Sequence, residues 1–277
     1  MLQLHRKQYI VKASFALQVL FNQGRGVPTV KIRQVALASS NLEEIDKTFR
    51  RLLGCDQTYA DPEIIYFGLD NRLYTLGDCF LEVVSPVQPN TAAGRFLDRR
   101  GGDGGYMVIA QVENLAEEQV RLADTAIRTV FADDRGNAKA IHLHPKDVPG
   151  AIPSLDEMSP PESWLWAGDG WEQRAGRHVR GILGVEIRSL DAKATGLCWA
   201  EAYGIELKAA GNGWRLEMGG TEIRFAFDAA AVEPALMAID IDAVDLDAIC
   251  AAADDMSLER DGHVVTVCGV DLNFVSH

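Results

Sequence analysis

The sequence predicts an α+β fold that consists of four copies of one β-α-β-β-β module. A short apolar strand that runs into an amphipathic helix occurs four times, beginning at Val30, Gly105, Gly181 and Ala235. Turn residues and further apolar strands follow each copy. The chain has 277 residues, of which 47% are hydrophobic, and this is enough for about two domains with substantial cores.

The first module shows the pattern in most detail. Its helix is predicted over residues 42–53, where apolar residues recur on one face, and Gly54 is suited to the left-handed conformation that often ends a helix. Gly77-Asp78 is a tight hairpin signal between two later strands. The three strands after the helix are expected over residues 63–68, 72–76 and 79–84.

The other three modules follow the same plan. In the second module we expect a helix over residues 115–130 and strands over 138–144 and 151–155. In the third we expect a helix over 192–203 and strands over 205–209, 214–218 and 222–227. In the fourth we expect a helix over 246–254 and strands over 264–268 and 271–275. The glycine-rich run 101–105 precedes a strand, which favours a flexible connection over a phosphate-binding loop.

Composition divides the chain into four parts. Residues 28–158 and 178–277 each contain two modules and form two predicted domains. Residues 159–177, called the linker below, contain three tryptophans within eight residues, so they are expected to pack across the domain junction or, alternatively, to form a lid over a cleft. Residues 1–27 are basic and form an extension, for which a signal peptide or a translation start at Val27 are two explanations.

Charge and cysteine content limit the partners and the compartment. The net charge of −13 opposes binding to nucleic acid or to an anionic membrane surface, and no apolar run is long enough to span a bilayer. The five cysteines are scattered without a CxxC pair, which indicates free thiols in a reducing, cytoplasmic compartment. We expect a monomer or homodimer that handles a small-molecule substrate.

Four sequence motifs resemble the vicinal oxygen chelate superfamily, which includes glyoxalase I, bleomycin-resistance proteins, methylmalonyl-CoA epimerase and type I extradiol dioxygenases. The motifs are Val35-Ala36-Leu37-Ala38 with Asn41-Leu42-Glu43-Glu44, then residues 80–86, then residues 111–115, and finally His144-Pro145-Lys146 before Gly150. The resemblance implies two tandem domains, each an open, incomplete β-barrel. In this family the barrel usually surrounds a divalent metal that leaves open positions for two substrate oxygens.

The positions that align with the family's metal ligands do not suit a divalent ion. In the first domain they are Gln34, Glu82, Met107 and Ser154, of which the last two are a soft thioether and a neutral hydroxyl. In the second domain they are Gly184, Arg224, Ala238 and Asn273. We therefore expect no metal and no cofactor in either domain.

The remaining candidates are acid-base and hydrogen-bonding groups. Glu82 is the predicted proton acceptor, with His142 and His144 as further catalytic candidates on one strand face. Alternatively, Gln34 or a backbone group satisfies Glu82, and His144 belongs to a turn. The predicted substrate-binding residues are Gln34, Tyr106, Met107, Ser154 and Arg224.

In the second domain, alternation along strands predicts that four polar side chains converge on the cleft face. They are Glu186, Arg224, Asp240 and Asn273. We favour a filled cavity that neutralises itself, because two carboxylates compensate one guanidinium. The alternative is an anion site in which Arg224 binds a substrate carboxylate.

Three functions are compatible with these residues. The favoured one is metal-independent proton transfer of the isomerase, epimerase or lyase type on a carbonyl-bearing substrate in the first-domain cleft. The second is a non-catalytic protein that binds or sequesters a small molecule, of the bleomycin-resistance type. The third is a metal-dependent extradiol-type dioxygenase, which the missing iron ligands disfavour.

Overall fold

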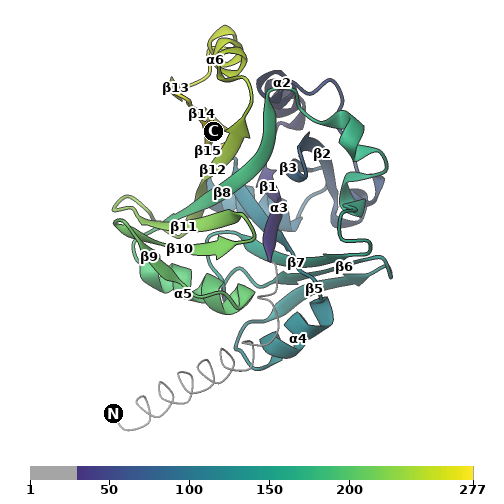
Figure 1. Cartoon of the computed structure of the whole chain (residues 1–277), viewed down its shortest axis with the longest axis vertical. Helices are drawn as coiled ribbons and strands as arrows, with labels where there is room; N and C mark the ends of the chain where they lie inside the picture. The colour runs from purple at the N-terminus through teal and green to yellow at the C-terminus, as the bar shows by residue number, and fades with distance from the viewer. Residues whose placement is uncertain (1–29, 277) are drawn as a thin grey trace.

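The computed structural model describes residues 30–276, which form two open β-sheets with helices packed along them (Figure 1). The predicted extension over residues 1–27 lies outside the described part. In order across the first sheet, the strands are β2 (Leu69–Leu76), β3 (Cys79–Pro86), β1 (Lys31–Ala38), β4 (Gly104–Gln111), β7 (Ile152–Met158), β6 (Ala138–Leu143) and β5 (Thr129–Asp134).

The second sheet has eight strands. In order they are β13 (Arg260–Asp261), β14 (Val264–Val267), β15 (Val270–Val275), β12 (Ala235–Ala243), β8 (Val179–Ser189), β11 (Thr221–Phe227), β10 (Gly213–Met218) and β9 (Lys208–Ala210). The helices are α2 (Leu42–Leu53), α3 (Ala92–Arg100), α4 (Leu115–Ala123), α5 (Ala192–Tyr203) and α6 (Leu246–Asp255). No helix within residues 30–276 is both long and apolar enough to cross a membrane.

The strand pairing repeats in both sheets and confirms the predicted fold class. In each module the first strand pairs in parallel with the last one, as β1 does with β3 and β8 does with β11. The first strands of two modules pair antiparallel at the centre of each sheet, β1 with β4 and β8 with β12. Each sheet therefore joins two modules around a pseudo-twofold axis and remains open at its edges.

Local capping chemistry explains where the helices begin and end. The side chains of Asn41, Thr91 and Asp191 each accept a hydrogen bond from a backbone N–H in the first turn of the helix that follows. Gly54 adopts the predicted left-handed conformation at the end of α2, with φ of 69°. Thr91 and Gly101 cap the two ends of α3 in the same way. This helix was not predicted from the sequence.

Two predicted elements were wrong. Residues 62–67 form a 3-10 helix instead of the strand predicted over 63–68, because Pro62 lies in its first turn and the Asp61 carboxylate accepts a hydrogen bond from the Glu63 N–H at 2.9 Å. The helix predicted over 115–130 ends at Ala123, and β5 follows it. The first sheet consequently has one strand fewer than the second.

The two sheets share one hydrophobic core. Outward-facing residues of β1 and β4 belong to the same buried cluster as residues of β8 and β12, together with one face of α2 and of α5. In Figure 1, α2 and α6 lie side by side at the top of the molecule, and α5 packs along β10 and β11 at the lower left. The Tyr203 hydroxyl of α5 donates a hydrogen bond to the Val108 carbonyl of β4 at 3.1 Å.

Glycine permits a close approach between the two sheets. Gly77, in the predicted hairpin between β2 and β3, has φ of 61°, and a Cβ there would lie 2.0 Å from the carbonyl oxygen of Arg180 in β8. A side chain at Gly77 would require both a strained backbone and a displacement of the second sheet. Gly136, in the hairpin between β5 and β6, has φ of 82°, but a Cβ there would meet no atom of the described chain within 4 Å.

We expect Gly77→Ala to lower the free energy of unfolding by more than about 2 kcal/mol, since strain at positive φ adds to a backbone clash. Gly136→Ala is the matched control and should cost about 1 kcal/mol, because only the left-handed backbone is strained there. Urea denaturation of both variants measures the difference. Equal losses would show that the contact between Gly77 and Arg180 does not constrain the packing of the sheets.

Candidate functional site

The concave face of the first sheet carries a cavity of about 620 Å³. Five of the predicted site residues line it, namely Gln34, Glu82, Tyr106, Met107 and His142. The cavity also takes side chains from α3, from the 3-10 helix at 62–67 and from the linker. Its apolar walls and a few converging polar groups are typical of a site for a small molecule.

Glu82 lies on the floor of this cavity and is held by two amide groups. Its two carboxylate oxygens accept hydrogen bonds from Gln34 Nε2 at 2.8 Å and from Asn71 Nδ2 at 2.7 Å. Burial raises the pKa of Glu82, while the hydrogen bonds from Asn71 and Gln34 lower it by a smaller amount. The result is a desolvated carboxyl group with a raised pKa in a ligand-sized cavity, which is typical of an acid-base residue.

Asp156 is a second carboxyl group in the cavity, and it was not among the site residues predicted from the sequence. It lies on β7, two residues after Ser154, and its Oδ2 accepts a hydrogen bond from Trp166 Nε1 at 2.7 Å. Burial raises the pKa of Asp156 to about 7, although the hydrogen bonds from Ser154 and Trp166 oppose this shift. Alternation along the strand places Asp156 on the same face as Ser154, and this was the available signal.

Ser154 does not line the cavity. It is fully buried, and its hydroxyl lies 3.1 Å from the carbonyl oxygen of Ile141 and hydrogen-bonds to Asp156. The structure therefore makes Ser154 a partner of Asp156, where we predicted a group in contact with substrate. Tyr106 and Met107 do reach the cavity from β4, and burial raises the pKa of Tyr106 to about 12.

The two histidines are separated. The ring of His142 lines the cavity, 4.6 Å from the ring of Phe131, and burial lowers its pKa to about 4. His142 is therefore uncharged at neutral pH. His144 follows the end of β6 in a turn, where its Nδ1 accepts a hydrogen bond from the Lys146 N–H at 3.0 Å, so it is not brought into the cavity.

The donor atoms around Gln34 do not fit a divalent metal. Gln34 Oε1, the atom that would bind a cation, already accepts a hydrogen bond from Trp164 Nε1 at 2.7 Å. Among residues 30–276, no group of three or more His, Cys, Asp or Glu side chains is arranged to hold a metal ion. The carboxylate of Glu82, between two amide donors, is arranged for hydrogen bonding.

The predicted convergence of charged groups in the second sheet is confirmed. The Arg224 guanidinium forms a two-point ion pair with Asp240, and its Nε lies 3.5 Å from a Glu186 oxygen. Asn273 Nδ2 donates to Asp240 Oδ1 at 2.8 Å. Arg224 thus lies in a network of acids on the second sheet and not among the residues that line the first-sheet cavity.

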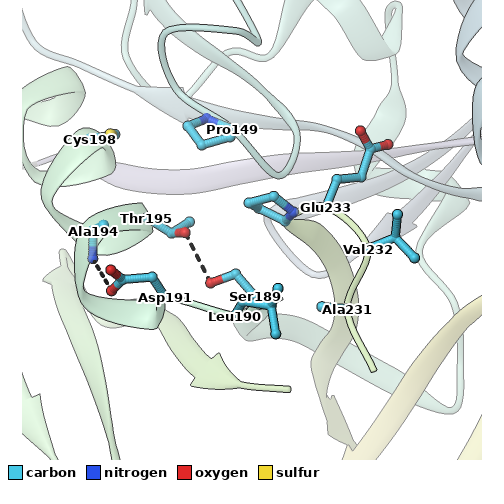
Figure 2. Close-up of a pocket in the computed structure, with 11 residues that line it drawn as sticks. Pro149, Ser189, Leu190, Asp191, Ala194, Thr195, Cys198, Ala231, Val232 and Glu233 are labelled. Carbon is cyan, nitrogen blue, oxygen red and sulfur yellow. Dashed lines mark hydrogen bonds between the residues drawn. The ribbon is translucent and has the colours of Figure 1, made fainter. Parts of the chain in front are cut away.

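A smaller hollow of about 300 Å³ lies between the loop at Pro149 and the start of α5 (Figure 2). In Figure 2 its polar groups point to one another: Thr195 Oγ1 lies 3.0 Å from Ser189 Oγ, and the Ala194 N–H donates to Asp191 at 2.9 Å. The lining is otherwise mostly apolar. The first-sheet cavity, which has two buried carboxyl groups, is the stronger candidate site.

The raised pKa of Asp156 predicts how stability depends on pH. Burial raises the pKa of this carboxyl group from 3.8 to about 7 in the folded state. Its protonation therefore contributes fully to stability below pH 3.8, and this contribution is lost as the pH rises through about 7. Asn does not titrate in this range, so the stability of Asp156→Asn should not fall in this way as the pH rises. Relative to the unmodified protein, the variant should gain up to about 3 kcal/mol in unfolding free energy between pH 5 and pH 8.

Urea denaturation at both pH values measures this gain. Asp147→Asn is the control, because hydrogen bonds from Arg128 lower the pKa of Asp147 to about 2 and it stays ionised throughout this range. A constant stability difference between Asp156→Asn and the unmodified protein would contradict a raised pKa at Asp156.

Arg224→Met should lower the free energy of unfolding by about 3 kcal/mol, because it leaves the carboxylate of Asp240 without its guanidinium partner. Arg177→Met is the control and should cost less than about 1 kcal/mol, since Arg177 pairs with Asp56 at an exposed surface. Chemical denaturation measures both values. A loss at Arg224 no greater than at Arg177 would argue against a structural network in the second sheet.

Comparison with known proteins relates the chain to one group of enzymes by sequence. Mouse (Mus musculus) mitochondrial methylmalonyl-CoA epimerase is 25% identical over 130 residues, which cover 46% of this chain and 72% of the epimerase. No model of a known protein family matches the chain. The sequence similarity thus concerns about half of the chain.

Two solved structures match most of the chain. A 4-hydroxymandelate synthase variant from Streptomyces coelicolor matches with a TM-score of 0.62 and 14% identity, over 84% of this chain and 76% of the synthase. A hypothetical protein from Staphylococcus aureus matches with a TM-score of 0.60 and 11% identity, over 90% of this chain and all of that protein. These likenesses show that the chain has the vicinal oxygen chelate fold, and together with the epimerase similarity they support the resemblance to that superfamily.

Proposed function

We propose that the protein catalyses proton transfer at a carbon next to a carbonyl group, as an isomerase or epimerase, in the first-sheet cavity. The observation that carries this proposal is the pair of buried carboxyl groups, Glu82 and Asp156, that line one cavity of about 620 Å³. Proton abstraction next to a carbonyl needs a base and a proton donor near the reacting carbon. The cavity supplies groups for both tasks.

Each group has a role that follows from its surroundings. Among residues 30–276, the donors to Glu82 are two amide N–H groups, which suits a carboxylate that acts as the base. Asp156 has a pKa of about 7, so both of its protonation states are populated near neutral pH and it can return a proton. Tyr106 keeps its proton because burial raises its pKa to about 12, and its hydroxyl makes no hydrogen bond within residues 30–276.

A free hydroxyl in the cavity is suited to the charge that forms on a carbonyl oxygen when the neighbouring carbon loses a proton. We assign this task to Tyr106, and we assign orientation of the substrate to Met107 and to the neutral ring of His142. This scheme needs no metal, in agreement with the donor atoms around Gln34. The similarity to methylmalonyl-CoA epimerase supports epimerase-type chemistry and makes acyl-CoA thioesters the first substrates to test.

Glu82→Gln should reduce turnover by at least about 100-fold while ligand affinity changes little, because the substitution removes the base but keeps the shape of the side chain. The measurement is deuterium uptake from D₂O at the α-carbon of methylmalonyl-CoA, with other acyl-CoA thioesters as further probes. Calorimetry with the same compounds reports binding. Glu217→Gln, an exposed site on the second sheet, is the control and should leave exchange unchanged.

Two results would contradict the proposal. Unchanged exchange in Glu82→Gln would exclude Glu82 as the base. Binding of these thioesters by the unmodified protein without any exchange would favour the alternative of a non-catalytic protein that sequesters its ligand.

A further inference from the structure

The linker is part of the wall of the candidate site. Trp164 is fully buried, and its ring stacks on Phe80 of β3 at a centroid distance of 6.1 Å and an interplanar angle of 10°. Trp171 packs edge-on against the same ring at 5.2 Å. Phe80 and Glu82 lie two residues apart on β3 and therefore share the concave face of the first sheet. The linker thus packs beside the proposed base.

The Trp164 indole determines which way the Gln34 amide faces. An indole N–H can only donate a hydrogen bond, so the Gln34 atom at 2.7 Å from Trp164 Nε1 must be the oxygen. The amide nitrogen of Gln34 then has to face Glu82, to which it donates at 2.8 Å. Rotation of this amide by 180° would place an oxygen opposite Glu82, and that arrangement would require a protonated carboxyl.

The side-chain amide of Asn71 is oriented in the same way. Its Oδ1 accepts a hydrogen bond from the backbone N–H of Asp61 at 2.9 Å, so its Nδ2 faces Glu82. Glu82 therefore lies between two amide groups, each oriented from behind by a group that can only donate. This orientation of both amides favours the carboxylate form of Glu82.

Trp166 acts directly on the other acid. Its Nε1 donates to Asp156 Oδ2 at 2.7 Å, and the Arg135 guanidinium lies 4.9 Å from the centre of its ring. The other titratable groups that act on the two acids are Asp61 and Tyr106 for Glu82 and Tyr203 for Asp156. Two of the three linker indoles thus reach the carboxyl groups of the cavity, Trp166 directly and Trp164 through Gln34.

We propose that Trp164 and Trp166 are positioning residues, whose indole N–H groups orient Gln34 and Asp156 and thereby set the protonation of the two acids. The linker then belongs to the acid-base machinery, although neither tryptophan exchanges a proton with substrate. This inference rests on the proposed roles of Glu82 and Asp156, but its test does not require turnover.

The test uses the full chain with ¹³C-labelled Glu and Asp carboxyl groups. The titrations of Glu82 and Asp156 are followed by NMR and assigned with Glu82→Gln and Asp156→Asn. Trp164→Phe keeps the stacked ring but removes the donor, and it should raise the apparent pKa of Glu82 by about one unit, a tenfold change in proton affinity. Trp166→Phe should raise that of Asp156 by a similar amount, because the carboxylate loses a donor.

Trp171→Phe is the matched control. Trp171 packs on the same ring of Phe80, and its indole N–H makes no hydrogen bond in the described part of the chain, so both titrations should stay unchanged. Unchanged titrations in Trp164→Phe and Trp166→Phe, or equal shifts in Trp171→Phe, would overturn the inference. Shifted titrations without deuterium exchange would support the inference and count against the proposed reaction only.

A measurement on the unmodified protein covers the case in which Trp164→Phe does not fold. The indole ¹H–¹⁵N resonance of Trp166 should change with pH at the midpoint measured for the Asp156 carboxyl, since the two groups share a hydrogen bond. A Trp166 resonance that does not respond to pH over the titration of Asp156 would overturn the inference.

Discussion

The burial of both helix-bearing sheet faces in one core is the constraint on which the rest of the structure depends. A β-α-β-β-β module cannot cover its own apolar face. Here the apolar faces of the two sheets contribute to one buried cluster and so cover each other. The close approach of Gly77 to Arg180 and the hydrogen bond from Tyr203 to Val108 are two specific contacts in this packing. Because the outer faces pack in this core, the concave face of each sheet can carry polar side chains.

The two concave faces differ because their polar residues differ. In the second sheet the Arg224 guanidinium lies among acids, and its charge is compensated within the network. In the first sheet no guanidinium of residues 30–276 bonds to Glu82 or Asp156; their partners are neutral amide, hydroxyl and indole groups. Neutral partners compensate less of the cost of burying a charge, so burial raises the pKa of both acids. The same fold therefore gives one self-neutralised face and one face with buried carboxyl groups whose pKa values are raised.

The sequence predicted the fold better than the site. Module periodicity and capping residues located α2 and α5 at their observed bounds, because these signals are local. The strand predicted over 63–68 failed where Asp61 and Pro62 favoured a 3-10 helix. Glu82 and Gln34 were found through the family pattern. Asp156 and the hydrogen bonds of Trp164 and Trp166 were missed, because these contacts depend on the linker folding back onto β1 and β7, and sequence spacing does not report them.

The two hydrogen bonds of Gln34 affect both metal binding and the proposed base, Glu82. A divalent cation at this position would need Gln34 Oε1 as a ligand, and the Trp164 N–H already uses that atom. Once Oε1 faces the indole, the amide nitrogen must face Glu82, and an N–H group cannot be shared with a cation. The buried Trp164 therefore occupies the oxygen that a cation would need, and it turns the amide N–H of Gln34 toward the Glu82 carboxylate. This arrangement is compatible with the proposed proton transfer, in which the protein's own acids would act.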